Sequence, residues 1–145
     1  MLVAEDDPHD VFVLSRAFRL AGLEGSVTFV NDGQEAIDFF SAEPSTSVEE
    51  PQEKPIPDLL LLDLKMPRLN GFQVLEWLRT QPGLKRLPVI VFTSSTLSQD
   101  VNRAYDLGAN SYVEKPGTNS DLSAFLDQLR QYWFGCNQAP DCRCP

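Results

Sequence analysis

The chain has 145 residues, of which 42% are hydrophobic and 23% are charged, a composition typical of one globular domain. This length excludes most multidomain enzymes, and the hydrophobic content excludes a disordered acidic tail. With 21 acidic and 12 basic side chains the formal net charge is −9, which disfavours direct binding of DNA or RNA because their phosphates would be repelled.

The sequence gives no sign of a membrane or secretory protein. Apolar stretches stay well short of the roughly 20 residues that span a bilayer, and residues 1–3 run directly into Glu5, which leaves no room for a signal peptide. We therefore expect a cytoplasmic protein with no membrane partner. Cys136, Cys142 and Cys144 all lie in the last ten residues, so we expect folding without disulfides and a loose, oxidisable tail.

Short apolar runs alternate along the chain with segments of helical period. The runs predict five buried strands, at residues 2–4, 27–30, 59–62, 89–92 and 112–113. Apolar side chains recur near a period of 3.6 in segments such as 11–21, 74–78 and 122–133, which predicts amphipathic helices. Because parallel neighbours need a crossover, this alternation predicts a doubly wound α/β fold, with helices on both faces of a parallel sheet.

Polar residues, glycine and proline mark the boundaries of these elements. Asp7 followed by Pro8 predicts a helix start, Asp32 precedes the second helix, and Thr118 with Asp121 fits a capping box. Residues 43–57 hold four prolines and four glutamates and predict a solvated loop, to which we assign no function. We expect one domain over residues 1–133 and a C-terminal tail over 134–145.

Acidic residues follow two of the predicted strands. Glu5 and Asp6 come directly after the first strand and Asp63 after the third, whereas Asp7 is assigned to the helix cap. In a doubly wound sheet the carboxyl ends of strands meet at the crevice where the strand order reverses, so these carboxylates should converge. An all-oxygen site of two or three acids with no nearby His or Cys favours Mg²⁺.

Two further polar residues end predicted strands on the same rim. Thr93 follows the fourth strand and offers a hydroxyl, and Lys115 follows the fifth and offers an ammonium. A metal, a carboxylate nucleophile, a hydroxyl and an ammonium around one crevice suit a phosphoryl group, whose oxygens need positive charge and donors on several sides. The residues therefore indicate phosphoryl transfer to aspartate.

The strand-end residues form separated motifs in register, and these are Glu5-Asp6, Asp63-Leu64-Lys65-Met66-Pro67 with Gly71, Thr93, and Tyr112 with Lys115-Pro116. Together, over residues 1–133, they resemble the response-regulator receiver domain of two-component signalling, including the intervals of 30 residues from Asp63 to Thr93 and 22 from Thr93 to Lys115. The resemblance implies a (βα)5 flavodoxin-like fold with the strands in the order 2-1-3-4-5.

Carried onto this sequence, the resemblance implies that Asp63 is the phosphoacceptor. Asp6 and Asp63 would bind Mg²⁺, with Glu5 helping through water and Lys65 contributing its backbone carbonyl. A different set of residues would serve the phosphoryl group and the response to it: Thr93 would hydrogen-bond the group, Lys115 would pair with it through a cis bond to Pro116, and Tyr112 would act as a rotating switch with Thr93. The Lys65 side chain, beside the acceptor, could shield or ligate the phosphoryl group.

Within the family the chain is most similar to small stand-alone phytochrome-associated regulators, through residues 84–88 and the aromatic run 132–134. This implies a signalling protein and not an enzyme, one that promotes only its own phosphorylation and dephosphorylation. Its partners would be a sensor histidine kinase, for example a phytochrome-type one, a downstream protein, and a second copy bound through the face of helices four and five.

Two other functions remain open at this point. A Mg²⁺-dependent aspartate-nucleophile phosphohydrolase also joins a carboxylate to a metal, but it usually carries the nucleophile after the first strand in an Asp-x-Asp pattern, where this chain has Glu5-Asp6-Asp7. A protein-binding module that is never phosphorylated would need none of the chemical residues that are present.

Overall fold

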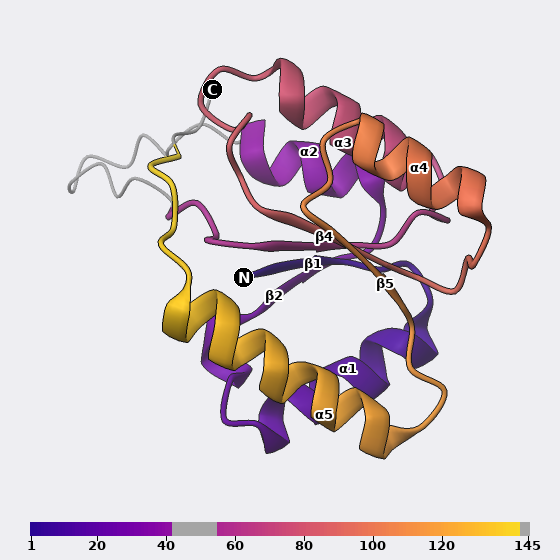
Figure 1. Ribbon diagram of the computed structural model, residues 1–145, viewed down its shortest axis with the longest axis vertical. Coiled ribbons are helices and arrows are strands. Elements are labelled where there is room, and N and C mark those ends of the chain that lie inside the picture. The colour runs from indigo at the N-terminus through magenta and orange to yellow at the C-terminus, as the bar shows by residue number, and fades with distance from the viewer. Residues whose placement is uncertain (42–54, 143–145) are drawn as a thin grey trace.

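The computed structural model describes residues 1–41 and 55–142, so most of the predicted loop 43–57, and Cys144, lie outside the described residues. Strands and helices alternate along the chain (Figure 1). Their bounds are β1 (Leu2–Ala4), α1 (Pro8–Leu20), β2 (Thr28–Val30), α2 (Gly33–Ser41), β3 (Leu60–Leu62), α3 (Gly71–Thr80), β4 (Val89–Thr93), α4 (Ser98–Asp106), β5 (Ser111–Glu114) and α5 (Asn119–Leu129). A 3-10 turn (Glu24–Ser26) precedes β2, and a π-helical turn (Arg130–Cys136) extends α5.

Within the described residues the strands form one parallel sheet in the order β2-β1-β3-β4-β5, which confirms the predicted fold class. Figure 1 shows α1 and α5 on one face of the sheet and α2, α3 and α4 on the other. The order reverses between β1 and β3, so the carboxyl ends of these two neighbouring strands frame the crevice of the fold.

The core has two layers because side chains alternate across each strand. In β1, Leu2 and Ala4 pack toward α2, α3 and α4, whereas Val3 packs toward α1 and α5. In β3, Leu60 and Leu62 join the first layer and Leu61 the second, and all three are at most 1% exposed. Burial on both faces explains why these strands are continuous apolar runs instead of alternating ones.

Side-chain caps fix where the helices begin. The Asp7 carboxylate accepts hydrogen bonds from the backbone N–H groups of His9 and Asp10, and Pro8 occupies the first helical position. Asp32 caps α2 in the same way through Glu35 N, at 2.8 Å. Thr118 caps α5 through the backbone N–H of Asp121, but the Asp121 carboxylate accepts the Thr118 hydroxyl hydrogen, so only the N-cap half of the predicted capping box is formed.

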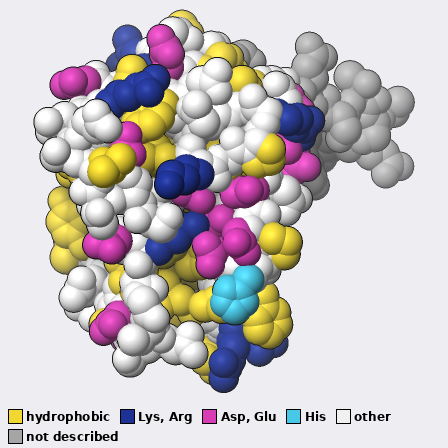
Figure 2. All heavy atoms as spheres, turned by 90° about the vertical axis from the view of Figure 1, so that its right-hand side faces the viewer, with side chains coloured by type: hydrophobic (Ala, Val, Ile, Leu, Met, Phe, Trp, Pro, Cys, Tyr) yellow, Lys and Arg dark blue, Asp and Glu magenta, His cyan; other side chains and the backbone are white. Residues whose placement is uncertain are grey.

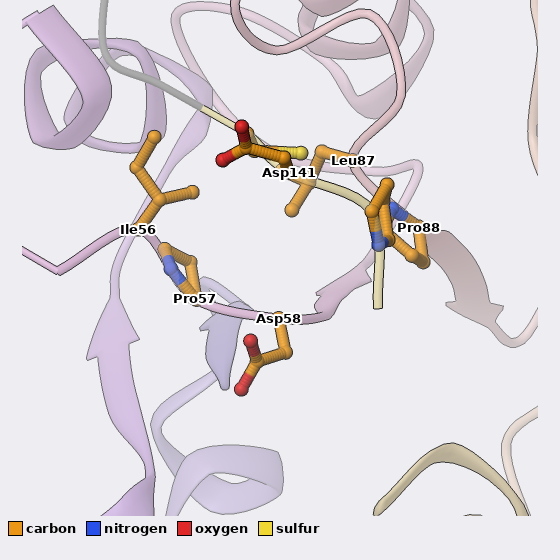
Figure 3. Close-up of a pocket in the computed structure, with 8 residues that line it drawn as sticks. Ile56, Pro57, Asp58, Leu87, Pro88 and Asp141 are labelled. Carbon is orange, nitrogen blue, oxygen red and sulfur yellow. The ribbon is translucent and has the colours of Figure 1, made fainter. Parts of the chain in front are cut away.

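The chain beyond α5 differs from the expected loose tail. The helical path continues as far as Cys136, and Cys142 packs against the core layer formed with α2, α3 and α4. The tail lies against residues that precede β3 and β4, so it crosses the edge of the sheet opposite the carboxyl ends of the strands (Figure 1). There it borders a cavity of about 220 Å³ (Figure 3), which is lined by Ile56, Pro57, Asp58, Leu87, Pro88, Pro140, Asp141 and Cys142. Burial raises the pKa of the Cys142 thiol, which makes it a weaker nucleophile than a free cysteine.

In the part of the chain that the structure describes, no helix has both the length and the apolar character needed to cross a membrane.

Candidate functional site

Three carboxylates meet at the carboxyl ends of β1 and β3. Glu5, Asp6 and Asp63 each contribute an oxygen, and these oxygens all lie within 4.8 Å of one another. Glu5 and Asp63 are 1% and 5% exposed, whereas Asp6 is partly exposed. Figure 2 shows acidic side chains gathered on this face beside the single histidine of the chain, with basic side chains among them. The convergence follows from the strand order, as the strand-end argument predicts.

The sheet and the following turn hold Asp63 in place. Its backbone N–H donates to Ala4 O of the neighbouring strand at 3.1 Å. Its Oδ1 accepts hydrogen bonds from the backbone N–H groups of Leu64 (2.7 Å) and Lys65 (3.4 Å), so this oxygen is oriented by its own loop. The Lys65 side chain itself is exposed.

Gly71 is required directly behind this loop. It is the first residue of α3, and its N–H donates to Leu64 O at 3.0 Å. An added Cβ would lie 2.2 Å from the Asp63 carbonyl oxygen. The helix can approach the acidic site this closely only because Gly71 has no side chain.

An ion pair with the β2–α2 loop also holds the loop that follows Asp63. Arg68 donates to Asp32 Oδ2 through both Nε (2.8 Å) and a terminal nitrogen (2.5 Å), which ties the β3–α3 loop to the β2–α2 loop. Arg68 has a φ of 63°, an uncommon value for a residue with a side chain. Although burial opposes it, hydrogen bonds from Glu35 N and Arg68 hold the pKa of Asp32 below its usual value.

Lys115, which follows β5, brings one ammonium to several carboxylates. Its Nζ lies 2.6 Å from Glu5 Oε2, 2.8 Å from Asp10 Oδ2 and 3.0 Å from Asp63 Oδ2. Glu5 Oε2 is buried, and apart from this ion pair with Lys115 it has no hydrogen-bond partner among the described residues. All peptide bonds of the described residues are trans, so the expected cis bond between Lys115 and Pro116 is wrong, and trans is the ordinary isomer at X–Pro.

These contacts shift the pKa values of Glu5 and Lys115. Burial raises the pKa of Glu5 to about 7, the ion pair with Lys115 partly offsets this rise, and the nearby charge of Asp63 adds to it. For Lys115, burial acts to lower the pKa, but the carboxylates of Asp10, Glu5 and Asp63 outweigh it and hold the pKa above its usual value. The ammonium therefore stays charged at every physiological pH.

Thr93 lies on β4 and Tyr112 on β5, and both form hydrogen bonds with Ser95 in the loop that follows Thr93. Thr93 is fully buried, and its Oγ1 accepts a 3.4 Å hydrogen bond from Ser95 N. The Tyr112 hydroxyl donates to Ser95 O at 3.0 Å, and burial raises its pKa. Ser95 Oγ in turn donates to Asp100 on α4 at 2.5 Å. The loop after Thr93 is thus bonded to Thr93, to Tyr112 and to α4.

The sequence reasoning did not identify Asp10 as a partner of Lys115. The signal for it was present, since Asp7 and Pro8 start the helix and place Asp10 at its third position, in the first turn next to the crevice. Sequence reasoning also missed the capping box at α3, where Asn70 and Gln73 bond each other's backbone N–H groups.

Comparisons with known proteins agree with this geometry. Residues 1–127 match the model of the response regulator receiver domain. A probable methanogenesis regulatory protein, FilR2 of Methanothrix harundinacea, is 32% identical over 140 residues, which is 97% of this chain and 86% of that protein. The response regulator Rcp1 of Synechocystis is 29% identical over 134 residues, covering 92% of this chain and 88% of Rcp1.

Solved structures give the same result. A phosphorylated cyanobacterial phytochrome response regulator, RcpA, superimposes with a TM-score of 0.81 at 29% identity and 96% coverage of both chains. The Mn²⁺-bound form of Rcp1 superimposes with a TM-score of 0.80, at the same identity and coverage. The protein belongs to the response regulator receiver domain family.

Proposed function

We propose that the protein accepts a phosphoryl group on Asp63 from a sensor histidine kinase and signals through a phosphorylation-dependent change of the face formed by α4, β5 and α5. One observation carries the proposal: Asp63 is a nearly buried carboxylate with Oδ1 oriented by two backbone N–H groups and Oδ2 paired with Lys115. Such a group is held in one orientation and lies next to a fixed positive charge, as nucleophilic attack on phosphorus requires.

In the proposed transfer, one carboxylate oxygen of Asp63 forms a bond to phosphorus while the bond from phosphorus to the kinase imidazole nitrogen breaks. The imidazole leaves with the electron pair of that bond and gains a proton, and Asp63 becomes an acyl phosphate. Lys115 stays charged and pairs with the phosphoryl oxygens, whose negative charge would otherwise be repelled by Glu5 and Asp6.

The acidic cluster fits a divalent cation. Apart from the ion pair with Lys115, Glu5 Oε2 is buried without a hydrogen-bond partner in the part of the chain that the structure describes, and the three carboxylates supply only oxygen ligands, which suit Mg²⁺. We propose that Glu5, Asp6 and Asp63 hold the ion together with the Lys65 carbonyl. Bound there, Mg²⁺ would neutralise charge on the phosphoryl group.

The output would pass through Thr93 and Tyr112. We propose that Thr93 hydrogen-bonds the phosphoryl group, which shifts the loop that also bonds Tyr112 and α4 through Ser95. The surface next to this loop exposes Leu97 (56%) and Tyr105 (48%), which offers apolar area to a downstream protein or a second copy of the chain. We place this signalling in the cytoplasm, with a phytochrome-type kinase as the donor, on the likeness to Rcp1 and RcpA.

The phosphohydrolase alternative gains no support from the site. Asp63, after β3, is the carboxylate with one oxygen oriented by two backbone N–H groups and the other paired with Lys115. Of the acids after β1, Glu5 pairs with Lys115, Asp6 belongs to the acidic cluster, and Asp7 caps α1.

The test is covalent modification by a small phosphoryl donor. The protein is incubated with acetyl phosphate and Mg²⁺ and its intact mass is measured; we expect one added phosphoryl group, abolished by EDTA and by Asp63→Asn. Asp58→Asn, an exposed aspartate before the same strand at the opposite edge of the sheet, is the matched control and should be modified like the wild type. Modification of Asp63→Asn to the wild-type extent would contradict the assignment.

A further inference from the structure

Among the described residues, Glu5, Asp10 and Asp63 surround the Lys115 ammonium, and of these three Asp10 is the one for which the proposed phosphorylation has no role. We propose that Asp10 is a positioning residue: through its 2.8 Å hydrogen bond it keeps the ammonium of Lys115 beside Asp63, ready for the phosphoryl oxygens. The inference rests on the proposed function, because it assigns a role in phosphorylation of Asp63.

A lysine at this place needs an anchor. Its ammonium ends a flexible four-carbon chain that otherwise loses its position readily. Lys115 has three N–H donors and faces three carboxylates, from β1, α1 and β3. Each contact restricts the ammonium, and together they leave its side chain only 16% exposed.

Among these anchors Asp10 is the one outside the acidic cluster. Glu5 and Asp63 belong to the group of carboxylates that could share a metal ion, and their oxygens would be engaged by a bound cation or by the phosphoryl group. Asp10 is not a member of that group, so its hydrogen bond to Lys115 remains when Glu5 and Asp63 bind the cation or the phosphoryl group. It therefore holds Lys115 at the moment when the ammonium has to turn to the phosphoryl oxygens.

The fold fixes Asp10 in the required place. The Asp7 cap accepts the Asp10 N–H, which sets the first turn of α1, and the side chain then reaches a lysine 105 residues away. Val13, Phe92 and Leu122 wall a small cleft beside the pair, and Figure 2 shows apolar side chains next to the acidic face. Apolar walls on one side reduce the screening of the ion pair by water.

The exposure of Asp10 limits how much its loss should slow phosphorylation. The Asp10 side chain is 35% exposed, and ion pairs with access to water contribute little on average. We therefore expect Asp10→Ala to slow phosphorylation of Asp63 by about fivefold, far less than loss of Lys115 itself. Asp10→Asn, which keeps an acceptor oxygen but loses the charge, should fall between the wild type and Asp10→Ala.

The experiment has two readouts. The first is the initial rate of modification by acetyl phosphate with Mg²⁺, for the wild type, both Asp10 variants and the control Asp38→Asn, which removes one exposed negative charge from α2. The second is the ¹⁵N resonance of the Lys115 ammonium, assigned by its absence in Lys115→Ala. In the wild type the ammonium should exchange slowly with water, and in Asp10→Ala it should exchange faster.

Each outcome decides the matter. A slower rate in Asp10→Ala together with a freer ammonium, and a wild-type rate in Asp38→Asn, supports the role. An unchanged rate, a rate that falls with the ammonium signal unaltered, an equal loss in Asp38→Asn, or an ammonium already in fast exchange in the wild type would overturn it. If wild-type Asp63 is not modified at all, the proposed function itself has failed, which is a distinct result.

Discussion

Replacing Gly71 with alanine tests how closely α3 must approach the phosphoacceptor. The added Cβ would lie 2.2 Å from Asp63 O and 2.8 Å from Leu64 Cα, more than 1 Å short of ordinary contact with the oxygen. Both neighbours are backbone atoms of the site loop, so neither can move aside as a flexible side chain would. Either α3 or the loop that carries Asp63 must shift.

Two opposing effects set the change in the free energy of unfolding that Gly71→Ala causes. Alanine improves helix propensity over glycine by up to about 1 kcal/mol, whereas overpacking a rigid site costs about 1–3 kcal/mol and more when backbone must move. The clash outweighs the gain, so we expect Gly71→Ala to lower the free energy of unfolding by about 2 kcal/mol, a fall in Tm of about 4–8 °C. Because Asp63 moves with its carbonyl, the rate of modification by acetyl phosphate should fall as well.

The assay is urea unfolding followed by circular dichroism. Gly25→Ala is the matched control: an added Cβ there meets nothing within 4 Å, and the residue has no positive φ, so its stability should match or slightly exceed that of the wild type. A Gly71→Ala protein as stable as the wild type and phosphorylated at the same rate would refute the reasoning.

Three further predictions concern side chains of the site. Burial raises the pKa of Glu5 from 4.5 to about 7, so the unfolded chain releases this proton at a lower pH than the folded protein does. The contribution of Glu5 to stability is therefore full below about pH 4.5 and is lost as the pH rises through 7. In buffer without Mg²⁺ the unfolding free energy of the wild type should therefore fall by roughly 3 kcal/mol more than that of Glu5→Gln between pH 4.5 and 8, and parallel curves would exclude this. Lys65→Asn should speed decay of phospho-Asp63 about two- to fivefold, followed by intact mass, because the exposed cation no longer shields the phosphoryl group; an unchanged decay rate rejects that role. Ser95→Ala removes the 2.5 Å hydrogen bond to Asp100 and should increase hydrogen exchange in the first turn of α4 roughly tenfold, whereas equal protection would show that this bond does not hold the helix.

The layers and the position of the site could be predicted from the sequence because they depend on local patterns. Residues 59–62 are four successive leucines, and a short apolar run of this kind is typical of a strand buried on both faces, whichever neighbours it pairs with. An acid directly after each of two parallel strands must lie at the carboxyl edge of the sheet, so the meeting of Glu5, Asp6 and Asp63 followed from the class of fold. The first residues of two strands were predicted wrongly, because Val27 and Leu59 continue the apolar pattern but lie outside β2 and β3.

Only the tertiary structure showed which partners those residues acquire. Asp10 reads as an ordinary first-turn acid, and nothing local indicates that Lys115 will reach it across 105 residues. Arg68 and Asp32 come from two loops that the sheet brings together, and Cys142 packs on the core although its sequence is that of a tail. Hydrophobic period is a property of one segment, whereas an ion pair depends on where two segments lie in space. The sequence therefore determined the strands, the helices and the edge at which the acids gather, and the packing of the sheet decided that one ammonium would serve three carboxylates.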